Sequence, residues 1–570
     1  MWREQPNQSC FSVTTGERPW RVAALAVALL VLVPLLALAW NAAQGSEGLW
    51  SHLGRYVLPR AGLNTVLLLA GVGGIAAVLG AGSAWLVSAH DFPGRGVLSW
   101  ALLLPLAMPT YIVAYAYLDL LHPLGPVQGL LRTLLGIDSP RDFRLPDVRS
   151  LGGCIVLLGF VLYPYVYLTT RAMFLTQAGG LLDAARALGV PRRALFIRVA
   201  LPLARPALAV GVALVLLETL NDIGASEFLG VQTLTVAVYT TWITRGDLPG
   251  AAQIALGMLL IVTLLVWLER HGRRRQRYAA GQRPRPMQAQ RLHGVAAVVA
   301  LALGAIPVLI GFLLPALYLA GSGIARLHSH GVSPALRDSA WNTVMVAGCA
   351  TLATLLAGLA VAWALRLAQA RRRTRLAGAC LRVASLGYAV PGTVLAIGLL
   401  SPLGWVDIGI GEALRPFGVE PRQWLMGSML ALVLAYVLRF LAIAIGSIDA
   451  GLARITPSLD QAARCLGQSA GGTLRRVHLP LLKPAMAAAA LLVFVDAMKE
   501  LPATLMLRPV NVETLATWLY ADAARGAYEE GAVAAFLIVL IGLVPVVLLA
   551  RSGMSQETRC ANASAGRETA

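Results

Sequence analysis

The stretch that decides the fold occurs twice in the chain. Residues 183–202 read DAARALGVPRRALFIRVALP, and residues 461–480 read QAARCLGQSAGGTLRRVHLP. Each copy starts with a short alanine-rich segment, reaches a glycine (Gly189 or Gly467) and ends in a Leu-Pro pair. Glycine suits the C-terminal cap of a helix, and proline suits the first turn of the next one. The spacing therefore predicts a short helix, a turn and the start of a longer helix in each copy.

The rest of the chain repeats with the same offset. Asn64-Thr-Val returns as Asn342-Thr-Val and Trp85 returns as Trp363, each 278 residues later. A membrane helix needs about 20 apolar residues, and runs of that kind occur near residues 22–43, 62–88, 97–118, 151–170, 206–230, 251–268, 294–320, 339–365, 383–405, 423–448, 484–507 and 531–550. The pattern predicts an all-α integral membrane protein of twelve transmembrane helices in two parallel six-helix repeats.

Composition agrees with a membrane protein and excludes a soluble enzyme. The 570 residues are 57% hydrophobic and 13% charged, and the mean hydropathy is +0.69. Such a chain is too apolar to be water-soluble at this size. The formal charge is +19; in a membrane protein this excess indicates topology and an acidic lipid surface, so we expect no nucleic-acid partner.

The distribution of basic residues predicts the topology. Lys and Arg gather on one side of the spans when both termini are placed in the cytoplasm. The predicted organisation is a cytoplasmic N-terminal tail (1–21), a first transmembrane half (22–268), a basic cytoplasmic linker (269–293), a second transmembrane half (294–550) and a cytoplasmic C-terminal tail (551–570).

The sequence predicts no enzyme activity and no cofactor for this chain. Its two lysines, Lys483 and Lys499, are followed by Pro484 and Glu500, so no phosphate-binding loop of the Gly-x-x-x-x-Gly-Lys-Ser/Thr type can be written. If transport uses ATP, another subunit binds it. The spans show neither a nucleophile beside a base nor a cluster of metal ligands, so we name no catalytic residue and leave any metal site unknown.

Four carboxylates lie inside the predicted spans. The fifth span carries Glu218 and Asp222, and the eleventh carries Asp496 and Glu500 at the same 278-residue offset. Spacing of i and i+4 predicts that each pair shares one helical face. Charge in a membrane is costly and is retained for a pathway or for pairing. Carboxylate oxygens suit a hard cation in a translocation pathway. The alternative is that the carboxylates are held by Lys499, Arg508 or helix N-termini, so both interpretations stay open.

The two copies quoted first resemble the EAA loops of ABC-transporter permeases. The family pattern is Glu-Ala-Ala, three residues, Gly, nine residues and an Ile-x-Leu-Pro ending. The matching residues are Asp183, Ala184, Ala185, Gly189 and Pro202 in the first copy, and Gln461, Ala462, Ala463, Gly467 and Pro480 in the second. Asp183 and Gln461 depart from the family's glutamate, which puts its acidic contact in doubt. The resemblance implies that these residues couple the chain to ATPase subunits.

Other segments are similar to the fused iron(III) permeases of binding-protein-dependent uptake systems. They begin at Pro109 (PTYIVAYAY), Asn221 (NDIGASEFLG) and Lys499 (KELPATLMLRP), and the resemblance covers about residues 22–550. It implies a type I ABC importer permease in the bacterial inner membrane that moves iron(III), two copies of a cytoplasmic ABC ATPase that use ATP, and a periplasmic iron-binding protein. Related permeases carry thiamine or other small solutes. The rival outside the class is an ion-coupled secondary transporter, which has no use for the paired loops.

Overall fold

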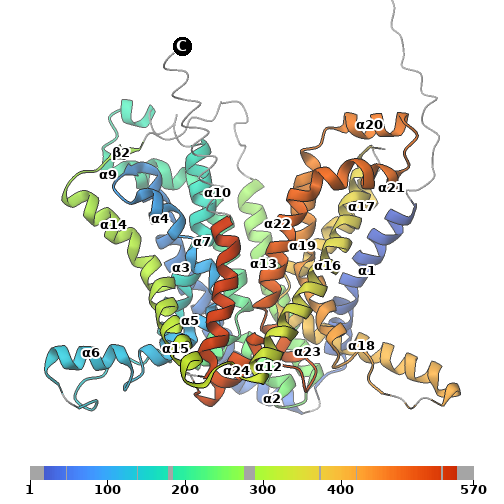
Figure 1. The fold of residues 1–570 in the computed structure, drawn as a ribbon, viewed down its shortest axis with the longest axis horizontal. Coiled ribbons are helices and arrows are strands. Elements are labelled where there is room, and N and C mark those ends of the chain that lie inside the picture. Colours follow the sequence, from blue (N-terminus) through green and yellow to red (C-terminus); the bar gives the residue numbers. More distant parts are fainter. Residues whose placement is uncertain are drawn as a thin grey trace, which may run out of the picture. The chain divides into compact units, whose positions relative to one another are not determined.

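The structure is a computed structural model that describes residues 18–46, 48–137, 139–177, 184–274, 289–370, 374–418, 420, 422–527 and 530–548. Within these ranges the chain is almost entirely helical (Figure 1). One short parallel pair of strands joins β1 (His90–Asp91) to β2 (Gln290–Arg291). Eleven of the described helices are long and apolar enough to cross a membrane, or twelve if one bent pair counts as a span. This confirms the predicted all-α membrane fold.

The described chain divides into two compact units that do not follow the two sequence repeats. Unit 1 contains the N-terminal segment up to Gln44 together with Trp341–Val512, and unit 2 contains Gly45–Ala340 together with the chain from Glu513 on. The first span therefore packs with most of the second repeat. The two transmembrane halves predicted at residues 22–268 and 294–550 correspond to the sequence repeats, and their boundaries stay a prediction.

Unit 1 is built around the first span and the helices of the second repeat. Its elements are α1 (Arg18–Ala43), most of α16 (Pro334–Ala370), α17 (Thr374–Ala384), η6 (Ser385–Tyr388), α18 (Gly392–Leu414), η7 (Arg415–Phe417), α19 (Met429–Ala453), α20 (Pro457–Cys465), α21 (Ala470–Thr473), η8 (Leu474–His478), α22 (Leu479–Met498) and α23 (Pro502–Leu507). Helix α1 packs closely on α18, because a Cβ at Gly398 would lie 2.4 Å from the carbonyl oxygen of Pro34. The Ser401 hydroxyl also donates to Asn41 Oδ1 at 2.9 Å.

Unit 2 holds most of the first repeat and three helical segments of the second. Its elements are α2 (Leu49–His52), η2 (Leu53–Val57), α3 (Leu58–Ala89), β1, α4 (Arg95–Ala101), η3 (Leu104–Ala107), α5 (Thr110–Leu120), α6 (Pro126–Leu135), α7 (Leu151–Gln177), α9 (Arg192–Leu195), η4 (Phe196–Ala200), α10 (Leu201–Asn221), α11 (Gly224–Phe228), α12 (Leu234–Ile243), α13 (Leu248–Arg274), β2, α14 (Val295–Val308), η5 (Leu309–Leu313), α15 (Leu314–His330), α24 (Leu515–Arg525) and the span Glu530–Leu548. Helix α3 packs on α7, since a Cβ at Gly80 would lie 2.6 Å from Val166 Cβ.

Four predicted spans are not continuous helices. The span predicted at 383–405 begins in α17, passes through η6 and continues as α18 after Pro391. The span predicted at 97–118 bends by 92° between its two helical parts. Pro109 begins the second part as its N-cap, with φ −57° and ψ 146°; proline has no N–H and disfavours helix in the residue before it. The spans predicted at 206–230 and 484–507 end early, at Asn221 and Met498, and the short helices α11 and α23 follow.

Candidate coupling and translocation sites

The two repeated loops have the local structure that their spacing predicts. Gly189 has φ +80° and Gly467 has φ +76°, the left-handed conformation that ends a helix. The N–H of the residue after each glycine donates to a carbonyl five residues earlier, at 3.1 Å in the first copy and 3.0 Å in the second. Pro202 and Pro480 lie in the first turn of α10 and α22. We call residues 184–200 loop 1 and residues 457–478 loop 2.

Each loop presents an exposed leucine immediately before its glycine. Leu188 is 85% exposed and Leu466 is 80% exposed. Of the residues that match the family pattern, Ala184, Gln461 and Ala462 are also exposed, Ala185 is half-buried and Ala463 is buried. Asp183 lies outside the described residues. The exposed leucines give each loop an apolar tip suited to a protein partner.

Loop 2 is fastened to unit 1 by a network of charged groups. Arg366 Nε donates to Asp460 Oδ2 at 2.9 Å, and His478 Nε2 is hydrogen-bonded to the other carboxylate oxygen. The remaining guanidinium nitrogens of Arg366 donate to the backbone carbonyls of Leu452 at 2.5 Å and Ile455 at 2.9 Å. The arginine and aspartate side chains are 13% and 12% exposed. One arginine of α16 thus holds both the end of α19 and the start of loop 2.

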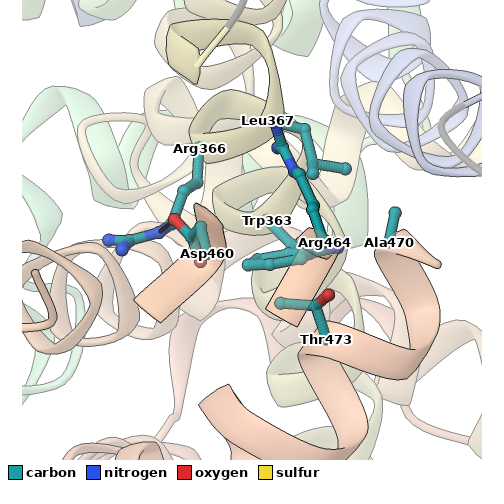
Figure 2. A pocket seen from close by; sticks show the side chains of 7 residues that line it. All are labelled: Trp363, Arg366, Leu367, Asp460, Arg464, Ala470 and Thr473. Atoms are coloured by element: carbon teal, nitrogen blue, oxygen red, sulfur yellow. Dashed lines mark hydrogen bonds and ion pairs between the residues drawn. The ribbon is translucent and has the colours of Figure 1, made fainter. Parts of the chain in front are cut away.

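The same network sets the ionisation of Asp460. Burial alone would raise the pKa of this carboxyl, but the hydrogen bond from His478 and the charge of Arg366 together lower the pKa below its ordinary value. Figure 2 shows Arg366 and Asp460 turned toward each other beside a small pocket, which Trp363, Arg464 and Thr473 also line. Asp460 is therefore a carboxylate at neutral pH.

Loop 1 is anchored differently. The residues at the positions equivalent to Arg366 and His478 are Ser88 and Ala200, which cannot form the charged network. Trp85 of α3 packs against Phe196 of loop 1, with ring centroids 5.3 Å apart, and its counterpart Trp363 packs against His478 of loop 2 at 4.8 Å. The two loops therefore share a backbone design and a packed tryptophan, and loop 2 adds the charged network.

Asp222 does not lie on the helix that carries Glu218, although the spacing predicted that both share one helical face. Its backbone is extended (ψ 125°) because α10 ends just before it. Its carboxylate accepts hydrogen bonds from the Ser226 N–H at 2.8 Å and hydroxyl at 3.0 Å, and from the Thr110 hydroxyl at 2.6 Å. The prediction that Glu218 and Asp222 share a helical face is therefore wrong, and Asp222 caps the short helix α11.

Glu500 has the same role in unit 1, with a charged partner added. Its carboxylate accepts from the N–H groups of Ala503 at 3.0 Å and Thr504 at 3.1 Å, and forms an ion pair with Arg439 Nη1 at 3.1 Å. Gly392 leaves the space for this pair, since a Cβ there would lie 2.0 Å from Arg439 Nη1. The shared helical face predicted for the second carboxylate pair is also wrong, because α22 ends before Glu500.

The other two carboxylates lie within membrane helices. Glu218 is half-buried in α10, and Asp496 of α22 pairs with Lys499 at 3.0 Å, where both side chains are about one-third exposed. These two carboxylates are more accessible than the two caps. The described residues contain no group of three or more His, Cys, Asp or Glu that could hold a metal ion.

The sequence reasoning missed two sets of residues. It assigned no partner to Arg439, which lies inside a predicted span and pairs with Glu500. It also passed over Arg366, Asp460 and His478. An available signal was that a buried arginine needs a carboxylate of its own.

Comparison with known proteins identifies the family. The model of the "Binding-protein-dependent transport system inner membrane component" family matches residues 76–278 and again 355–556, which together are more than half of the chain. The chain is 24% identical to the Fe(3+)-transport system permease protein FbpB 2 of Haemophilus influenzae over 85% of this chain and 88% of the relative. It is 26% identical to a probable ABC transporter permease, y4fN of Sinorhizobium fredii, over 91% and 93%.

A relative of half the length matches one part of the chain. The molybdenum transport system permease protein ModB of Escherichia coli is 31% identical over 34% of this chain and 85% of its own length. Two family matches in one polypeptide agree with the 278-residue repeat and the paired loops. The chain thus belongs to the family of binding-protein-dependent transport system inner membrane components, as a fused, two-copy permease subunit of an ABC importer.

Proposed function

We propose that this permease carries iron(III) from the periplasm to the cytoplasm. The observation that carries the proposal is the likeness over most of the chain to a fused relative named as an Fe(3+)-transport permease. The charge of Glu218 adds support, because a half-buried carboxylate in α10 would attract a cation and repel an oxyanion such as molybdate.

The proposed partners follow from the two loops. Two copies of a cytoplasmic ABC ATPase would dock on the exposed tips around Leu188 and Leu466, and ATP would be bound and hydrolysed there, with no cofactor held by this chain. A periplasmic iron-binding protein would deliver the cargo. This arrangement requires loops and termini on the cytoplasmic side of a bacterial inner membrane, which is the topology that the basic residues favour.

The proposed mechanism is rigid-body alternation between inward-open and outward-open states. Closure of the ATPase pair on ATP would move the two loops, and each loop would carry that motion into its unit. The charged network at Arg366 and Asp460 fits this role in loop 2, because four contacts, and not one flexible side chain, tie the loop to α16 and to the end of α19.

The test is transport in proteoliposomes that hold the permease, its ATPase and its binding protein. We expect ATP-dependent entry of radiolabelled iron(III), and no entry of radiolabelled thiamine or molybdate at the same concentration. Entry of thiamine or molybdate in place of iron would refute the proposed cargo. Transport without ATP would refute the proposed coupling and favour an ion-driven transporter.

A further inference from the structure

Three oxygen-bearing side chains from three short helices meet in unit 2, and none of them is one of the four carboxylates discussed above. They are Glu227 of α11, Tyr239 of α12 and Tyr520 of α24. The Tyr520 hydroxyl donates to Glu227 Oε2 at 2.5 Å, and Tyr520 is also hydrogen-bonded to Tyr239. In Figure 1, α12 and α24 lie at the end of unit 2 opposite to α9, which belongs to loop 1.

The side chains of the cluster are packed against a neighbouring ring but remain partly exposed. Phe228, next to Glu227, stacks on the Tyr520 ring with centroids 5.5 Å apart and an interplanar angle of 26°. Glu227, Tyr239 and Tyr520 are each half-buried. The packing fixes the direction of the phenol oxygen, and the partial exposure leaves the oxygens within reach of a solute.

The three residues of the cluster are not repeated in the sequence, although the chain around them is. By the 278-residue offset, the positions of Glu227 and Tyr239 correspond to Leu505 and Thr517, and Tyr520 corresponds to Trp242. The positions related to the cluster by the repeat therefore carry neither the carboxylate nor a phenol, so the sequence repeat does not account for these three side chains.

The donor set matches one class of ligand. Carboxylate and phenolate oxygens are hard donors that suit a hard, highly charged cation, and tyrosine serves as an iron ligand in proteins. Binding would replace the phenol proton of Tyr520 by the metal, and the proton would leave to water with no change of oxidation state. Since the described residues hold no cluster of His, Cys, Asp and Glu for a metal, phenols are the donors to consider.

We propose that Glu227, Tyr239 and Tyr520 form a transient iron(III)-binding site that receives the cargo within the permease. The proposal rests on the proposed function, because it takes iron(III) as the transported ion. A transient site needs few protein donors, since the cation must leave again, and water would complete its coordination.

Optical spectroscopy of the purified permease tests the site without transport. The permease in lipid nanodiscs is titrated with iron(III) nitrilotriacetate, and phenolate coordination gives a visible phenolate-to-iron charge-transfer band. We expect this band in the natural protein, its loss in Tyr520→Phe, and at least a tenfold weaker apparent affinity in Tyr239→Phe and Glu227→Gln. Both phenylalanine variants keep the ring volume, and Tyr520→Phe keeps the stacking on Phe228. Size-exclusion profiles verify that the variants stay folded.

Tyr318→Phe is the matched control, because it also removes a phenol that donates a hydrogen bond to a carboxylate, that of Asp119, but outside the proposed site. Its band should equal that of the natural protein. No band in the natural protein, or a band that survives Tyr520→Phe, would overturn the site. Iron uptake in proteoliposomes without the band would leave the proposed function standing and remove only this site, whereas loss of both would remove the cargo assignment as well.

Discussion

The network that fastens loop 2 makes a quantitative prediction for Arg366→Met. This change removes the arginine that touches Asp460 and the carbonyls of Leu452 and Ile455, and it leaves a carboxylate that is only 12% exposed. Breaking a buried ion pair by removal of one partner costs about 3–5 kcal/mol. Because His478 still contacts Asp460, we take the lower end, about 3 kcal/mol. At about 1.4 kcal/mol per power of ten, the opening equilibrium of loop 2 should rise by about two powers of ten.

Hydrogen–deuterium exchange of the purified permease measures that opening. In Arg366→Met we expect amides of α20 (Pro457–Cys465) to exchange about a hundredfold faster, with no change in α7 of unit 2. Arg382→Met is the control, since Arg382 is exposed and its Nε donates only to the carbonyl of Gly378 at 3.1 Å.

A double variant separates the charge from the packing. Arg366→Met combined with Asp460→Asn removes both charges, so the penalty of an uncompensated carboxylate disappears. Its α20 exchange should lie closer to that of the natural protein than the single variant does. Unchanged exchange in Arg366→Met, or equal exchange in the single and double variants, would refute the reasoning.

Three further predictions use the same structure. Valine at both Gly189 and Gly467 should abolish the stimulation of the ATPase, because both glycines have positive φ and valine there costs about 1–2 kcal/mol per site. The protein should stay folded, since no atom lies within 4 Å of an added Cβ. Asparagine, which tolerates that φ, should retain most of the stimulation. Glu500→Gln should lower the membrane yield several-fold, because it removes the carboxylate that pairs with Arg439. Asp496→Asn should slow iron uptake at normal yield. Equal yields of the two variants would refute the assignment of a structural role to Glu500 and a transport role to Asp496. The pKa of Asp460 is lowered in the folded protein, so the stabilisation by its carboxylate is full above about pH 4, the ordinary pKa of Asp. This stabilisation is lost as the pH falls from that value through the folded-state pKa. In a melting series, the stability difference between the natural protein and Asp460→Asn should shrink only below about pH 4.

Much of the fold could be predicted from the sequence because its signals are local and repeated. The spans follow from hydropathy, and the glycine turns of the loops follow from spacing, as the positive φ of Gly189 and Gly467 confirms. The exchange of α1 into unit 1 was beyond reach, since an apolar run shows that a span exists but not which helices it packs against.

The carboxylates show where spacing alone misleads. An i, i+4 pair fits a continuous helix as well as a helix that ends between the two residues. A better signal was present, because Asp222 and Glu500 each precede a residue with a hydroxyl four positions on, Ser226 and Thr504, and such pairs suit helix caps. The Arg439–Glu500 pair spans 61 residues of sequence and had no local signal.

The two repeats perform the same structural tasks with different chemistry. A hydroxyl from Thr110 completes the cap at Asp222, while the guanidinium of Arg439 completes the cap at Glu500. In both loops a tryptophan packs on the loop, Trp85 on Phe196 and Trp363 on His478, and loop 2 adds the charged network. Removal of one partner of a buried ion pair costs about 3–5 kcal/mol, and loop 1 has no such pair at the positions equivalent to Arg366 and His478. Because the two ATPase copies that we propose are identical, any difference between the responses of the two loops to ATP must originate in this chain, at these anchors.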